Sequence, residues 1–143
     1  MNICVVYYSK FGNNGIIAEY IGKKFREKDH TATVNSNREV EPDALPKADL
    51  YVFCSPSAMG NAAGKMNKFL TKAVFENADA SYTISATYML EGSKTLETLT
   101  DVLEKKAIKK ASPGLELKVD TVKGPLEEGY EKKLDSLVEE LVG

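Results

Sequence analysis

The sequence has no tryptophan, one histidine and two cysteines, and these low counts argue against several kinds of site. A structural zinc ion needs several cysteine or histidine ligands at short spacing, and the chain offers no such group. A nucleophilic triad would depend on His30, which we place on a strand away from the loops. Cys4 and Cys54 both lie in apolar runs, so we expect buried thiols rather than a disulfide.

Long apolar runs and a strong net charge are also absent. No run approaches the ~20 residues of a membrane-spanning helix. The apolar stretch at residues 4–8 is too short for the core of a signal peptide, and no basic region precedes it. The formal net charge is −2, which argues against a nucleic-acid partner. We therefore expect a cytoplasmic protein that binds neither membranes nor nucleic acids.

The composition is that of a folded domain. The chain has 143 residues, of which 43% are hydrophobic and 28% are charged. A chain of this length can bury roughly two-thirds of the surface that it exposes when unfolded. No linker, repeat or low-complexity tract divides it, so we expect one domain over residues 1–143.

Short apolar runs alternate with amphipathic segments along the whole chain. Strands are expected from the N-terminus to residue 8 and at residues 30–34, 50–54, 82–88 and 115–122. Helices are expected at residues 15–28, 62–76, 96–107 and 126–142. Ile16 and Val74 are predicted to be among the inward-facing residues of the first two helices. The alternation predicts an α/β fold, a doubly wound five-stranded parallel sheet flanked by helices.

Three polar loops should meet at one edge of this sheet, at residues 9–14, 55–61 and 87–93. Ligands of such sheets bind beyond the carboxyl ends of the strands. The first loop leads into a helix and has no proline, so the backbone N–H groups of residues 10–15 can point toward one spot. The helix dipole favours an anion there, as in many phosphate sites. Taken alone, however, this loop is equally well interpreted as an ordinary strand-to-helix turn.

Other phosphate-binding motifs of α/β proteins do not fit. The segment from Gly60 to Lys65 is one residue short of a P-loop, and Met66 stands where a magnesium-binding hydroxyl is needed. The glycine pattern of dinucleotide-binding loops is absent. A phosphatase loop would need an arginine six positions after its cysteine, and the residue at that distance from Cys54 is Gly60. A receiver domain would need an aspartate at the end of the third strand, where this chain has Cys54 and Ser55.

The three loops instead resemble those of flavodoxins. Ser9-Lys10-Phe11-Gly12-Asn13-Asn14 is similar to the FMN phosphate loop of that family, whose usual form is Thr/Ser-x-Thr/Ser-Gly-x-Thr. Residues 55–60 are similar to the second flavin loop, and residues 87–92 stand where the family has its third. The resemblance covers nearly the whole chain, and the length matches the short-chain form. It implies the strand order 2-1-3-4-5.

The resemblance implies an FMN site with two parts. The phosphate would be held by Ser9, Lys10, Phe11, Gly12, Asn13 and Asn14. The ring would lie between Ser55, Pro56, Ser57, Ala58, Met59 and Gly60 on one side and Thr87, Tyr88, Met89 and Gly92 on the other. Tyr88 is the expected stacking partner. A peptide near Met59 and Gly60 would flip on reduction, because glycine tolerates a positive φ angle.

Three of these positions depart from the usual pattern of the family. Phe11 and Asn14 replace hydroxyl residues of the phosphate loop, and Ala58 stands where an aromatic residue often flanks the ring. A charge-assisted hydrogen bond to phosphate is worth about 1.5–3 kcal/mol, so the loss of one donor weakens binding about tenfold or more. The backbone donors and the helix dipole would still carry most of the site.

The function implied by the resemblance is electron transfer. FMN would be the cofactor, redox partner proteins would be the partners, and the protein would be a monomer or weak dimer. Such a carrier needs no catalytic acid, base or metal, so we favour it over a true enzyme. Two alternatives stay open. Phe11 and Ala58 fit a flavodoxin-like module that has lost FMN and binds proteins, and Ala58 also fits a small FMN-dependent oxidoreductase with a quinone-type acceptor.

Overall fold

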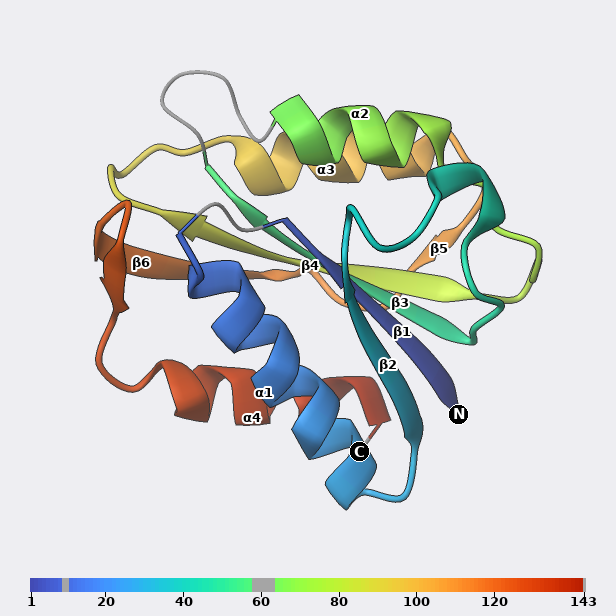
Figure 1. The fold of residues 1–143 in the computed structure, drawn as a ribbon, viewed down its shortest axis with the longest axis horizontal. Coiled ribbons are helices and arrows are strands. Elements are labelled where there is room, and N and C mark those ends of the chain that lie inside the picture. Colours follow the sequence, from blue (N-terminus) through green and yellow to red (C-terminus); the bar gives the residue numbers. More distant parts are fainter. Residues whose placement is uncertain (9–10, 58–63, 143) are drawn as a thin grey trace.

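A mostly parallel sheet forms the centre of the protein. The computed structural model describes residues 1–8, 11–57 and 64–142. Five parallel strands follow the order β2-β1-β3-β4-β6 (Figure 1). They are β1 (Asn2–Tyr7), β2 (Thr31–Ser36), β3 (Leu50–Pro56), β4 (Ser81–Tyr88) and β6 (Leu115–Thr121). This order confirms the predicted α/β fold, with β6 as the fifth predicted strand.

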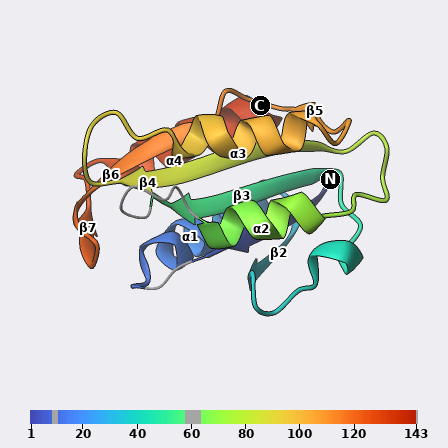
Figure 2. The same cartoon turned by 90° about the horizontal axis from the view of Figure 1, so that it is seen from above.

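Helices cover both faces of the sheet. In the described part of the chain, α1 (Asn13–Glu27) and α4 (Tyr130–Val142) lie on one face, and α2 (Gly64–Lys72) and α3 (Thr95–Glu104) lie on the other (Figures 1 and 2). A short 3-10 helix, η1 (Pro42–Ala44), precedes β3. None of the described helices is long and apolar enough to cross a membrane.

Each face of the sheet has its own hydrophobic core. Successive side chains of a strand point to opposite faces, so Val52 of β3 packs beneath α1 and α4 while Phe53 packs beneath α2 and α3. Both side chains are fully buried. A strand that is buried on both faces has apolar residues at successive positions, which explains the continuous apolar run of β3.

The two cysteines lie in different cores, Cys4 under α2 and α3 and Cys54 under α1 and α4. Both thiols are free and buried, as the sequence predicts. Burial raises the pKa of Cys4 to about 11 and that of Cys54 to about 12. Neither thiol is therefore a reactive thiolate near neutral pH.

Two small strands were not predicted. β5 (Lys109–Lys110) runs parallel to β4, and β7 (Gly124–Leu126) pairs with β6 in the antiparallel direction. Residue 126 was expected to begin the last helix, but α4 begins at Tyr130. The sheet extends into this segment because Leu126 pairs with Val119, a contact that the local sequence pattern does not contain.

The inward-facing positions also need two corrections. Ile16 is 52% exposed, because Ile17, Ala18 and Ile21 form the stripe of α1 that packs on the sheet. Val74 is 50% exposed. It lies after the end of α2 at Lys72. Its backbone N–H donates to the carbonyl of Pro42 and not to a carbonyl of the helix.

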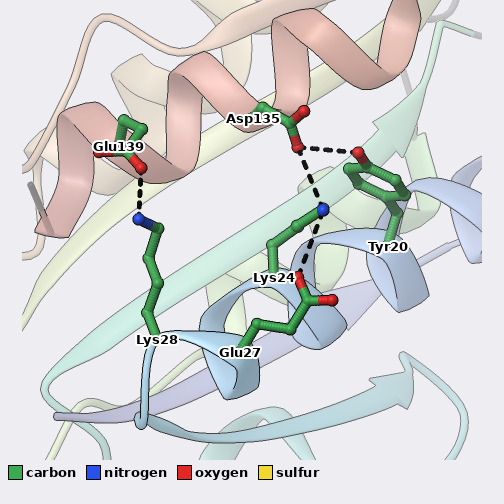
Figure 3. A network of polar contacts seen from close by, with 6 residues as sticks. All are labelled: Tyr20, Lys24, Glu27, Lys28, Asp135 and Glu139. Carbon is green, nitrogen blue, oxygen red and sulfur yellow. Dashed lines mark hydrogen bonds and ion pairs between the residues drawn. The ribbon is translucent and has the colours of Figure 1, made fainter.

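Polar side chains join α1 to α4 (Figure 3). The Tyr20 hydroxyl donates to Asp135 Oδ1 at 2.8 Å, and Lys24 Nζ lies 3.9 Å from the same oxygen. Further along the two helices, Lys28 pairs with Glu139. These groups are partly or largely exposed, so each contact contributes little to stability. Together they link the two helices that cover this face of the sheet.

The hydroxyl of Tyr82 leads to a testable prediction about stability. It is buried and has no hydrogen-bond partner among the residues that the structure describes. A buried donor without a partner is unfavourable, so Tyr82→Phe should raise the free energy of unfolding by about 0.5–1 kcal/mol. Urea unfolding measures this.

Tyr51 provides the matched control for this prediction. It is fully buried, but its hydroxyl donates to the Pro46 carbonyl at 2.6 Å. Tyr51→Phe should therefore lower the free energy of unfolding by about 1 kcal/mol. Equal losses in both variants would contradict the unsatisfied state of the Tyr82 hydroxyl.

Candidate functional site

The expected site lies at the carboxyl edge of the sheet. β1, β3 and β4 are parallel and end at Tyr7, Pro56 and Tyr88, so the three predicted loops follow at the same edge. The start of α1, the loop after β4 and strand β7 lie at one end of the molecule, on the left in Figures 1 and 2. Of the predicted site residues, Ser9, Lys10, Ala58, Met59 and Gly60 lie outside the described residues.

Gly12 sits at the N-terminus of α1. It is the N-cap residue, with a φ angle of +98°, and beyond its two chain neighbours none of the described residues has a heavy atom within 4 Å of where its Cβ would be. The first turn of the helix carries no acidic side chain. A positive helix end with open space and no nearby carboxylate on its first turn suits an anion such as phosphate.

Asn13 and Asn14 point into the protein. Asn13 is 9% exposed and its Nδ2 donates to the carbonyl of Val122, in the turn between β6 and β7, at 3.1 Å. Asn14 is 1% exposed and its Nδ2 donates to Thr87 Oγ1, at the end of β4, at 3.1 Å. The two side chains therefore tie the first turn of α1 to other parts of the sheet edge.

Phe11 lies at the surface beside this helix end, and it is 45% exposed. A phenyl ring has no hydrogen-bond donor, so the side chain at this position contributes nothing to the binding of a phosphate.

The second loop begins with three residues that the structure describes. The Ser55 side chain is fully buried and its hydroxyl donates to the Pro56 carbonyl at 3.1 Å. Pro56 pairs with Thr87 in the register of β3 and β4. The Ser57 N–H donates to the Thr87 carbonyl at 2.8 Å, so this loop leaves the sheet directly beside the third one.

The third loop contains a half-buried aromatic residue, Tyr88, followed by half-buried Met89. Burial raises the pKa of the Tyr88 hydroxyl, and the nearby carboxylates of Glu91, Glu127 and Glu116 add to this effect. The phenol is therefore neutral near pH 7, which suits a ring-packing role. Gly92, with a φ angle of +86°, lies exposed further along the loop.

The structure adds three residues that sequence reasoning missed. The hydroxyl of Ser93 lies 2.8 Å from that of Ser57 and joins the second and third loops. The carbonyl of Val122 accepts the bond from Asn13, and at Gly124 a Cβ would come within 3.0 Å of Asn13 Oδ1. Glycine followed by proline, as at residues 124 and 125, favours a turn, but this signal does not indicate what the turn would contact.

Comparisons with known proteins identify the family. The flavodoxin family model matches residues 5–132. A short-chain flavodoxin associated with a non-canonical PDU bacterial microcompartment has a similar structure, with a TM-score of 0.81 and 17% identity, over 99% of this chain and 97% of that one. Flavodoxin 2 from Bacillus cereus has a TM-score of 0.79 and 17% identity, over 99% and 97% of the two chains.

A third solved structure is the Fusobacterium nucleatum flavodoxin bound to flavin mononucleotide, with a TM-score of 0.74 and 12% identity over 97% of this chain and 95% of that one. None of the curated proteins matches this sequence. The structural likenesses, at these identities, establish the fold alone, whereas the family model spans most of the chain. The chain therefore belongs to the flavodoxin family.

Proposed function

We propose that this chain binds FMN and shuttles electrons between redox partner proteins, as a single domain over residues 1–143. The observation that carries the proposal is the start of α1, where Gly12 leaves open space at a positive helix end. This helix end is bonded to the end of β4 through Asn14 and Thr87. Flavodoxins typically bind FMN, and the one from F. nucleatum was solved with it.

The described residues of this edge fit a flavin whose phosphate lies at the start of α1 and whose ring lies between the second and third loops. Backbone N–H groups of the first turn of α1 would hold the phosphate, together with Ser9 and Lys10 as the resemblance to flavodoxins implies. Ser57 and the residues after it would line one side of the ring, and Tyr88 and Met89 the other. When bound, FMN supplies the redox chemistry itself, so the protein has to bind, orient and shield it.

Beyond the two chain neighbours of Gly12, the described residues leave its Cβ position open, and this favours the proposal over a module that has lost FMN because an anion needs room at the helix end. The visible absorption spectrum of the purified protein, before and after adding FMN and desalting, tests the proposal. We expect a retained flavin band. A colourless protein that takes up no FMN would overturn the proposal and favour the protein-binding module.

Restoring a donor at residue 11 should strengthen FMN binding. In Phe11→Thr, the hydroxyl would add a charge-assisted hydrogen bond to the phosphate, worth about 1.5–3 kcal/mol. We therefore expect the dissociation constant of FMN, measured by quenching of flavin fluorescence, to fall about tenfold or more.

Phe11→Val is the matched control, because valine has nearly the shape of threonine without its hydroxyl. It should leave the dissociation constant of FMN close to that of the original protein. The same gain in both variants would mean that removal of the aromatic ring, rather than a new donor, causes the effect.

A further inference from the structure

Thr87 stands where the three loops of the site meet. Its side chain is buried, with 3% exposure. Its carbonyl accepts the N–H of Ser57 from the second loop at 2.8 Å, and its hydroxyl oxygen accepts Asn14 Nδ2 from the first turn of α1 at 3.1 Å. Thr87 is itself the first residue of the third loop, at residues 87–93. One residue of β4 thus contacts both other loops directly.

A second hydrogen bond joins the second and third loops. The hydroxyls of Ser57 and Ser93 lie 2.8 Å apart, so the second and third loops are joined both at the sheet edge and further out. The first loop is attached differently, because the side chain of Asn14 bonds to Thr87 of β4. The Thr87 hydroxyl therefore connects the phosphate end to the ring end.

The neighbouring threonine of β4 provides a comparison. Thr83 lies on the same face of the strand, is fully buried and bonds to the Ser112 hydroxyl at 2.7 Å. Its partner lies in the segment before β6 and belongs to none of the three loops. Thr83 and Thr87 thus share chemistry and burial but differ in what they join.

We infer that the Thr87 hydroxyl is a positioning group, which holds the first turn of α1 in line with the two ring loops. This inference rests on the proposed function. Asn14 is 1% exposed, so without an acceptor at residue 87 the N–H that its side chain donates to Thr87 would lose this acceptor inside the protein. The loss of a buried hydrogen bond is unfavourable, and the first turn of α1 would shift. The phosphate donors move with it, because they belong to the same turn.

Three variants test the inference. Thr87→Val removes the hydroxyl and keeps the shape, Thr87→Ser keeps the hydroxyl, and Thr83→Val is the control for a lost buried hydroxyl. Each is measured for its dissociation constants with FMN and with riboflavin, which lacks the phosphate. Amide hydrogen exchange of Ile16, Ile17 and Ala18 in the protein without flavin gives an independent readout.

We expect Thr87→Val to bind FMN about tenfold more weakly while its affinity for riboflavin changes about twofold or less. Exchange at residues 16–18 should be faster than in Thr83→Val, and Thr87→Ser should restore both properties. If Thr87→Val and Thr83→Val behave alike in FMN affinity and in exchange, the inference is overturned while FMN binding by the original protein still stands. If the original protein takes up no FMN, the proposed function falls, and a selective effect on exchange still supports Thr87 as the joint between the loops.

Discussion

Replacing Gly12 by aspartate should abolish the retention of FMN. The side chain would enter the open space at the N-terminus of α1, and its carboxylate would compete with the phosphate for the same positive helix end. Two unit charges ~4 Å apart repel by about 4 kcal/mol at an effective dielectric constant of ~20, which corresponds to a loss of affinity of about 1000-fold. Absorption after adding FMN and desalting measures the result.

Two further variants separate charge from backbone strain. Gly12→Asn has nearly the same shape and the same positive φ angle but no charge, so it should keep most of the affinity for FMN. Gly129→Asp places a carboxylate before another helix, α4, at a glycine with a φ angle of +80° and equally open surroundings. It should keep the flavin band. If Gly12→Asp also keeps it, the phosphate does not lie at the start of α1.

Replacing Gly114 by alanine should strongly destabilise the fold. Gly114 precedes β6 with a φ angle of +92°, and a Cβ there would lie 2.8 Å from the Ile84 carbonyl oxygen and 2.7 Å from Leu96 Cδ1. The left-handed backbone costs about 1–2 kcal/mol with a side chain present, and overpacking costs about 1–3 kcal/mol more. We expect the free energy of unfolding in urea, measured without FMN, to fall by about 2–5 kcal/mol.

Gly92→Ala is the control for this substitution. Its φ angle is +86°, and beyond its two chain neighbours none of the described residues has a heavy atom within 4 Å of where its Cβ would be. It should therefore show only the strain of the left-handed backbone, about 1–2 kcal/mol. Equal losses at the two glycines would mean that β6 moves away from Ile84 and Leu96 at no cost, contrary to the close packing described above.

The sequence was most informative where a property depends on near neighbours in the chain. The periodicity of Ile17, Ile21 and Phe25 predicted α1, and the unbroken apolar run at residues 50–54 predicted the strand that is β3. It was less informative for β7. Leu126 continues the apolar spacing of α4, so this segment looked helical, but pairing with Val119 places it in the sheet.

Local patterns of apolar and polar residues were thus enough to predict a parallel α/β sheet and the edge at which three loops meet. The order of the five main strands came from the resemblance to flavodoxins. They could not predict that Asn14 bonds to Thr87, 73 positions away, or that Asn13 bonds to Val122, 109 positions away. Helix and strand periodicity arises from contacts within a few residues. Bonds between distant side chains depend on the register of the strands and on the direction of α1 across the sheet, and only the folded chain sets these.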